Sequence, residues 1–83
     1  MDKVQILLST YNGEKYLKEQ IESILKQQEV EVNILVRDDG STDNTIKILE
    51  ELVKKENISY YKGENLGPAK SFMDLVEKAD ANF

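Results

Sequence analysis

Two adjacent aspartates, Asp38 and Asp39, follow an apolar run and have the most evident capacity for chemistry in this sequence. Carboxylates at the end of a buried strand are costly unless hydrogen bonds or a ligand satisfy them. As acceptors they could bind the N3–H of a pyrimidine base, or they could ligate a hard cation through oxygen. They could instead join Ser41 and Asp43 in capping the next helix. Local chemistry leaves these alternatives open.

A second polar segment, Ser9-Thr10-Tyr11-Asn12-Gly13, also follows an apolar run. Ligands of open α/β sheets bind beyond the carboxyl ends of the strands, which is where this segment is expected. Tyr11 offers an aromatic face for a base, and Ser9 or Thr10 can hydrogen-bond a ribose or a base edge. The alternative is purely structural, with Asn12 capping a helix and Tyr11 as a half-buried aromatic of the turn.

The third segment of interest is the loop Gly63 to Gly67, followed by Pro68 and Lys70. A glycine-containing loop before a helix presents N–H groups to an anion, and Lys70 would add positive charge. The spacing differs from that of a phosphate-binding P-loop, and a Gly-Pro helix start with a solvated Lys is the competing interpretation.

The hydrophobic periods alternate between strand-like and helix-like, which predicts β-α-β-α-β-α order with a Rossmann-like parallel sheet. The expected strands are Lys3–Ser9, Val32–Arg37 and Ile58–Lys62. The expected helices are Gly13–Gln28, with Asn12 as N-cap, a second beginning near Asp43, and a third beginning at Pro68. The predicted buried faces are Leu17, Ile21, Ile24 and Leu25; then Ile46, Leu49, Leu52 and Val53; then Ala69, Phe72, Met73, Val76 and Ala79.

The composition of the 83 residues bounds the function. Sixteen acidic against 11 basic residues, a net charge of -5, argue against a nucleic-acid partner. No apolar run is long enough to span a membrane. The absence of Cys and His excludes thiolate zinc sites and Ser–His or Cys–His catalysis within this chain. A strand should follow the third helix, so we expect residues 1–83 to be part of a larger domain.

The segments VQILLSTYNGEKYLKEQIESIL, VRDDGSTDNT and ENLGPAKSF together resemble the N-terminal, nucleotide-binding half of family 2 glycosyltransferases. The third segment further resembles the rhamnosyltransferase-like branch. The resemblance covers essentially the whole chain and implies the GT-A fold. It places Tyr11 on the uracil or thymine base, with Ser9 and Thr10 beside it. It also assigns the base-binding aspartate to Asp39, with Asp38 adjacent, and places Lys70 near the diphosphate.

The resemblance implies a transferase that moves a sugar from a UDP- or dTDP-sugar to an acceptor hydroxyl with inversion. Its divalent cation, Mg²⁺ or Mn²⁺, would have its ligands outside this chain, as would the general base, so the chain alone is expected to be inactive. Asp80-Ala81-Asn82 is interpreted as the end of a helix rather than as metal ligands. The implied location is cytoplasmic, at the inner face of the membrane for the full-length protein.

Two further expectations complete the sequence-based picture. A different function class, a signalling or interaction module that uses Asp38 and Asp39, remains the alternative to the transferase. The family's strand order would leave the first strand at the edge of the sheet, where unpaired backbone groups favour self-association.

Overall fold

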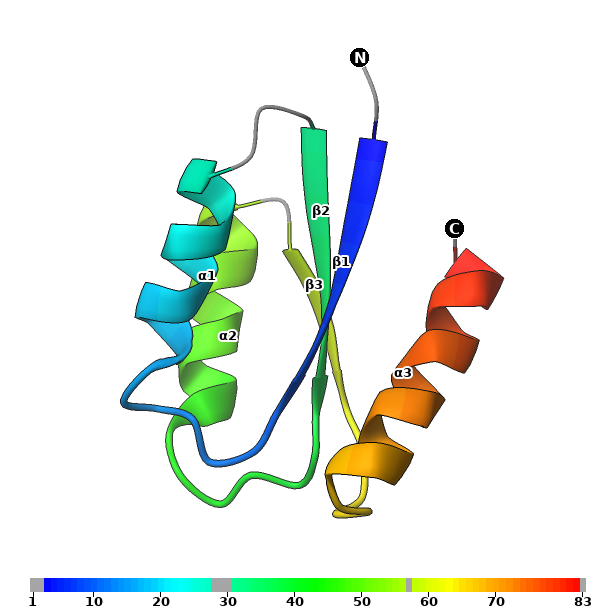
Figure 1. Ribbon diagram of the computed structural model, residues 1–83. Coiled ribbons are helices and arrows are strands. Elements are labelled where there is room, and N and C mark those ends of the chain that lie inside the picture. Colours follow the sequence, from blue (N-terminus) through cyan, green and yellow to red (C-terminus); the bar gives the residue numbers. More distant parts are fainter. Residues whose placement is uncertain (1–2, 28–30, 57, 83) are drawn as a thin grey trace.

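The computed structural model describes residues 3–27, 31–56 and 58–82 of the chain, and Figure 1 shows their arrangement. Strands and helices alternate as the sequence predicts. The elements in order are β1 (Lys3–Thr10), α1 (Leu17–Gln27), β2 (Glu31–Asp38), α2 (Thr45–Lys55), β3 (Ile58–Lys62) and α3 (Pro68–Asn82).

The three strands form one parallel sheet in the order β1-β2-β3. β1 pairs with β2 from Lys3↔Glu31 to Thr10↔Asp38, and β2 pairs with β3 from Ile34↔Ile58 to Asp38↔Lys62. The α/β class and the parallel sheet are therefore confirmed. Since all three strands run the same way, the loops that follow them gather at one edge, at the bottom of Figure 1.

Helices α1 and α2 cover one face of the sheet, and α3 covers the other (Figure 1). The larger core lies under α1 and α2. It consists of Leu17, Ile21, Val32, Ile34, Val36, Leu49, Leu52 and Ile58. The predicted face of α1 is confirmed, because Ile24 and Leu25 pack against this core. On α2, Ile46, Leu49 and Leu52 point inward as predicted, but Val53 is exposed and Thr45 is buried in its place.

The smaller core lies between the sheet and α3 and consists of Leu35, Leu75 and Ala79, with Leu7 and Tyr61 packed against it. The predicted buried face of α3 is wrong except at Ala79. Phe72, Met73 and Val76 are exposed, as is Ala69. The helix instead turns Ser71, Leu75 and Ala79 toward the sheet, a spacing of four residues that keeps all three on one face.

The predicted start of α1 is also wrong. Asn12 has a positive φ of 48° and does not cap α1, which begins only at Leu17. Its side chain instead accepts a hydrogen bond from the N–H of Thr42, in the loop before α2. The predicted end at Gln28 lies outside the described residues. α3 begins at Pro68 as predicted and includes residues 80–82, which confirms that segment as helical. No helix in the described part of the chain is long and apolar enough to cross a membrane.

Candidate functional site

A cavity of about 560 Å³ opens at the carboxyl edge of the sheet. It brings together four of the six residues that the sequence predicts for a site: Ser9, Thr10, Tyr11 and Asp39. The remaining lining residues are Leu7, Leu8, Asn65, Gly67, Pro68 and Phe72. The cavity is thus mainly apolar with a few polar groups, a composition typical of small-molecule sites. The apolar lining was not predicted, and Phe72 was expected in the core.

Tyr11 follows β1 directly and is 52% exposed, so its ring is available to a ligand. The loop that contains Tyr11 is hydrogen-bonded to residues before and at the start of α2. The N–H groups of Asn12 and Gly13 donate to Ser41 Oγ and Thr45 Oγ1, at 2.8 and 2.9 Å. These contacts fix the backbone on the carboxyl side of Tyr11.

Asp39 is 3% exposed and lies just beyond the end of β2. Its Oδ1 accepts from Arg37 Nη1 at 2.6 Å and from the N–H of Leu66 at 3.0 Å, and its Oδ2 accepts from the N–H of Gly67 at 3.2 Å. Burial alone would raise the pKa of this carboxyl. The N–H of Leu66, the Arg37 guanidinium and the N–H of Gly67 outweigh that effect and hold the pKa below its usual value.

Arg37 is 2% exposed and is the charged partner of Asp39. Its Nε donates to Asp74 Oδ2 at 2.9 Å, and its Nη1 also donates to Ser71 Oγ at 2.9 Å. Burial opposes its charge, but the hydrogen bonds that it donates to Asp74 and Asp39, together with their negative charges, raise its pKa. Sequence analysis missed this residue. The signal was a lone Arg inside the apolar run of β2, because a buried cation requires a partner.

Asp74 and Ser71 extend the network from α3 to the neighbouring strands. Asp74 Oδ2 also accepts from Tyr61 Oη at 2.8 Å, and Ser71 Oγ lies 2.6 Å from Ser9 Oγ. Burial, the hydrogen bond to Asp74 and the charge of Asp74 together raise the pKa of Tyr61 to about 12. The hydroxyl of Tyr61 therefore stays protonated and donates to Asp74.

Asp38 does not line the cavity. It is 1% exposed, and both of its carboxylate oxygens accept from Ser41, one from the N–H and one from the hydroxyl. Asp38 thus holds the turn after β2, which is the structural alternative considered above. Asp38 is therefore not available to a signalling module that uses this pair, whereas Asp39 lines the cavity.

The loop Gly63 to Gly67 also differs from the expectation. The N–H groups of Leu66 and Gly67, which were expected to face an anionic ligand, are bound to the Asp39 carboxylate. The anion that these N–H groups bind is therefore the Asp39 carboxylate, a side chain of the protein itself. Lys70 is exposed on the first turn of α3 and lies outside the residues that line the cavity.

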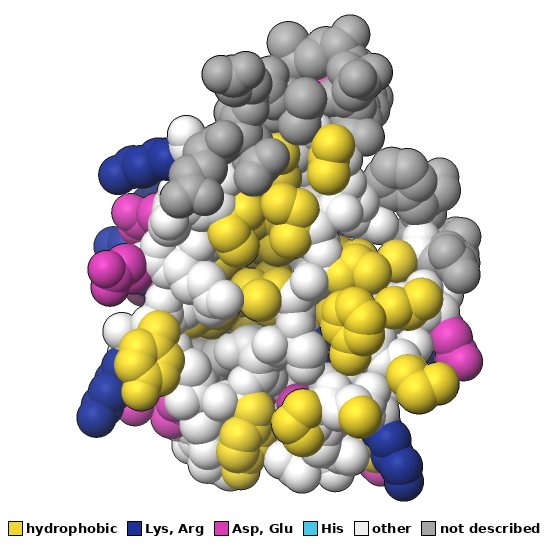
Figure 2. Space-filling model, in the orientation of Figure 1, with side chains coloured by type: hydrophobic (Ala, Val, Ile, Leu, Met, Phe, Trp, Pro, Cys, Tyr) yellow, Lys and Arg dark blue, Asp and Glu magenta, His cyan; other side chains and the backbone are white. Residues whose placement is uncertain are grey.

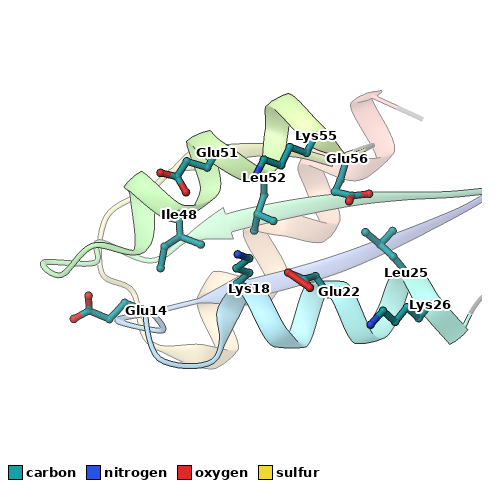
Figure 3. Close-up of a pocket in the computed structure, with 10 residues that line it drawn as sticks. All are labelled: Glu14, Lys18, Glu22, Leu25, Lys26, Ile48, Glu51, Leu52, Lys55 and Glu56. Carbon is teal, nitrogen blue, oxygen red and sulfur yellow. The ribbon is translucent and has the colours of Figure 1, made fainter.

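A second cavity of similar volume, about 560 Å³, lies between α1 and α2 (Figure 3). Leu25, Ile48 and Leu52 form its apolar part, and the other lining residues are Glu14, Lys18, Glu22, Lys26, Glu51, Lys55 and Glu56. None of the predicted site residues lines it. Its charged residues are of both signs and come from α1, α2 and the segments next to them, so it has no recognisable chemistry of a site.

The described residues contain no group of three or more acidic side chains placed to hold a metal ion. Asp39 already accepts three hydrogen bonds and Asp38 accepts two. The polar groups of the cavity are therefore suited to hydrogen bonding with a ligand.

Curated relatives align with most of the length of this chain. The chain is 37% identical over 81 residues to the dTDP-rhamnosyl transferase RfbG of Shigella flexneri, covering 88% of this chain and 27% of RfbG. It is 34% identical over 87 residues to the poly(ribitol-phosphate) beta-N-acetylglucosaminyltransferase TarS of Staphylococcus aureus, covering all of this chain and 15% of TarS. The chain thus spans about a quarter or less of these relatives.

Solved structures agree with the fold. The crystal structure of S. aureus TarS residues 1–349 in complex with UDP matches with a TM-score of 0.79 and 33% identity, covering 96% of this chain and 25% of that chain. The complex with UDP-GlcNAc gives a TM-score of 0.78 over 94% of this chain and 23% of that chain, also at 33% identity. The model of the glycosyl transferase family 2 matches residues 5–83. With nearly the whole sequence matched and the fold shared, this chain belongs to glycosyl transferase family 2.

Proposed function

We propose that this chain binds the nucleotide of a UDP- or dTDP-sugar and is the donor-binding part of a glycosyltransferase. The observation that carries the proposal is the single cavity that unites Ser9, Thr10, Tyr11 and Asp39 at the carboxyl edge of the sheet. The position supports it, because open α/β sheets bind ligands at this edge. Membership of family 2 supports it as well, since similar structures contain UDP and UDP-GlcNAc.

In this proposal the base stacks on Tyr11, and Asp39 accepts the hydrogen bond of its N3–H. The exposed ring and the ionised, acceptor-only carboxylate both suit those roles. We assign Lys70 to the diphosphate, because it is exposed and lies two residues after Pro68, which lines the cavity. Asp38 supports the site by shaping the turn beyond β2.

We further propose that the parent enzyme transfers the sugar to an acceptor hydroxyl with inversion at the anomeric carbon. The described residues do not fit the divalent cation of such a reaction, because they hold no cluster of acidic ligands and Asp38 and Asp39 are engaged internally. Nucleotide recognition is therefore the step that we assign to this chain. We expect no sugar transfer from it alone.

Calorimetric titration of the chain with UDP, dTDP and ADP tests the proposal, and we expect binding of the two pyrimidine nucleotides in preference to ADP. Tyr11→Ala should weaken UDP binding by about 1–3 kcal/mol through lost base stacking. Asp39→Asn should weaken it by about 1.5–3 kcal/mol, because a hydrogen bond to a charged acceptor is lost.

Tyr16→Ala is the matched control for Tyr11→Ala. Tyr16 is 67% exposed and lies outside the cavity, so its removal should leave UDP binding unchanged. Thermal unfolding of each variant separates lost binding from lost folding, which matters for Asp39 because it also pairs with Arg37. Equal affinity for UDP and ADP, or unchanged affinity in both site variants, would contradict the proposal.

A further inference from the structure

Arg37 does not line the cavity, yet it is connected to two polar side chains that do. It donates to Asp39 directly and reaches Ser9 through the hydroxyl of Ser71. We propose that Arg37 is a positioning residue that sets hydrogen-bond polarity in the site, making Asp39 the acceptor and Ser9 the donor, and so selects bases with N–H beside C=O. This inference rests on the proposed function and names how the same site selects its base.

The first half of the argument concerns the Asp39 carboxylate. Each carboxylate oxygen can accept about two hydrogen bonds. Oδ1 already accepts from Arg37 Nη1 and from the N–H of Leu66, whereas Oδ2 accepts only from the N–H of Gly67 among the described residues. One acceptor position therefore remains on Oδ2, and the adjacent guanidinium favours the ionised form that keeps it an acceptor.

The second half concerns the two serines. Ser71 Oγ accepts from Arg37 Nη1, and a guanidinium has no acceptor to offer in return. Ser71 is 0% exposed, so its hydroxyl hydrogen must find a partner within the protein, and Ser9 Oγ lies 2.6 Å away. Ser71 therefore donates to Ser9. The hydroxyl hydrogen of Ser9 is then left to donate to a ligand in the cavity.

An acceptor at Asp39 and a donor at Ser9 complement one kind of base edge. Uracil and thymine present an N3–H donor beside a carbonyl acceptor, and both hydrogen bonds can form. Cytosine has the same size but presents an unprotonated N3 to Asp39 and has an amino donor at position 4 in place of the carbonyl of uracil, so both contacts are mismatched when Ser9 faces position 4. Such a paired contact discriminates about tenfold or more between bases.

Arg37 is itself held by residues that do not line the cavity. Asp74 Oδ2 accepts from Arg37 Nε at 2.9 Å and from Tyr61 Oη at 2.8 Å. The carbonyl of Glu64 accepts from Nη2 at 3.2 Å, and Gly63 leaves the space that the guanidinium occupies. The guanidinium therefore has one position, and that position determines both contacts toward the cavity.

The test compares UDP with CDP, because the two differ in base-edge polarity and share the ribose and diphosphate. Calorimetric titrations of the chain at about pH 8 should give a UDP preference of about tenfold or more. Arg37→Met should lower the ratio of the two affinities several-fold at this pH. Ser71→Ala, which removes the link to Ser9, should lower the ratio several-fold. If the Arg37→Met protein does not fold, Asp74→Asn is the substitute, because Asp74 is partly exposed. It should lower the UDP/CDP ratio, but by less than the loss of Arg37 would.

The pH dependence of the UDP/CDP affinity ratio distinguishes a positioning role of Arg37 from a purely structural one. Without the positive charge of Arg37 beside it, the pKa of Asp39 rises, and a protonated carboxyl accepts poorly from uracil. Lowering the pH from about 8 to about 6 should therefore reduce the UDP/CDP ratio in Arg37→Met but not in the original chain or in Asp74→Asn, which both keep the guanidinium. Titration of the diphosphate affects both nucleotides alike and cancels.

Asp43→Asn is the matched control. It makes the same chemical change as Asp74→Asn at a carboxylate that binds Thr45 and Glu14 outside the network, and it should leave the ratio unchanged. If the variants weaken UDP and CDP equally at every pH, Arg37 has only a structural role and the inference fails while the proposed function stands. If the original chain binds neither nucleotide, both fail.

Discussion

Gly63 has no side chain at the point where the guanidinium of Arg37 passes, and a Cβ there would overlap that group. Two ion pairs, to Asp39 and Asp74, hold the guanidinium in place. Moving it aside would therefore cost the free energy of these contacts. Gly63→Ala should therefore lower the free energy of unfolding by about 1–3 kcal/mol, as overpacking does elsewhere. Urea denaturation monitored by circular dichroism measures the change.

A double-mutant cycle checks that Gly63 acts through Arg37. In an Arg37→Lys background the bulky guanidinium is gone, so the added cost of Gly63→Ala should be clearly smaller. Equal costs of Gly63→Ala in the two backgrounds would mean that the alanine disturbs something other than Arg37.

At the level of single residues, sequence analysis located part of the lining of the candidate cavity. Tyr11 and Asp39 were found because their positions after predicted strands place them at the ligand-binding edge. Asp38 was grouped with Asp39, yet successive side chains of a strand point to opposite faces. That alternation places Arg37 and Asp39 on one side and Asp38 on the other. Applying it would have separated the roles of the two aspartates and paired Arg37 with Asp39.

Among the elements, α3 shows the largest difference between expectation and structure. Hydrophobicity favoured a face with Phe72, Met73 and Val76, but the helix buries Leu75 and turns Met73 to solvent. Leu75→Ala should destabilise the protein by about 2–4 kcal/mol because it leaves a cavity against the sheet. Met73→Ala, at a position that is 66% exposed, should change stability by no more than about 0.5 kcal/mol. Chemical denaturation of both variants measures this difference.

The opposite result, with Met73→Ala costing more stability than Leu75→Ala, would support the hydrophobic face predicted from sequence.

The predicted face of α3 is wrong because polar contacts orient the helix. Ser71 and Asp74 must meet Arg37 on β2, and this requirement turns α3 so that Leu75 follows them inward. The strands and the α1 face were predictable because each contains an apolar run or period long enough to identify it, even though β2 ends in the buried charges of Arg37 and Asp38.

Over the whole molecule, β1 lies at one edge of the sheet, with Val4 exposed and residues 5–10 partly buried. β1 pairs with β2 alone within the described part of the chain, and Figure 2 shows hydrophobic side chains gathered over β1 and α3. Exposed strand edges pair with other chains. We therefore expect the chain to self-associate through β1. Sedimentation velocity at several concentrations should show a dimer or a larger species.

Val4→Lys places a charge on the β1 edge at a residue that is 39% exposed, and it should shift the population toward monomer. Val53→Lys is the matched control, because Val53 is 38% exposed but belongs to α2, which covers the face of the sheet opposite α3 and packs against β3. A monomer at every concentration for the original chain would contradict self-association.

The cross-links between the first two loops have a consequence for how a nucleotide would enter. The N–H groups of Asn12, Gly13 and Glu14 each donate to a side chain of the segment before or at the start of α2. The backbone next to Tyr11 has thus already lost its conformational entropy during folding. A base that stacks on this ring need not order the loop again, so little of the binding free energy is spent on restricting the chain.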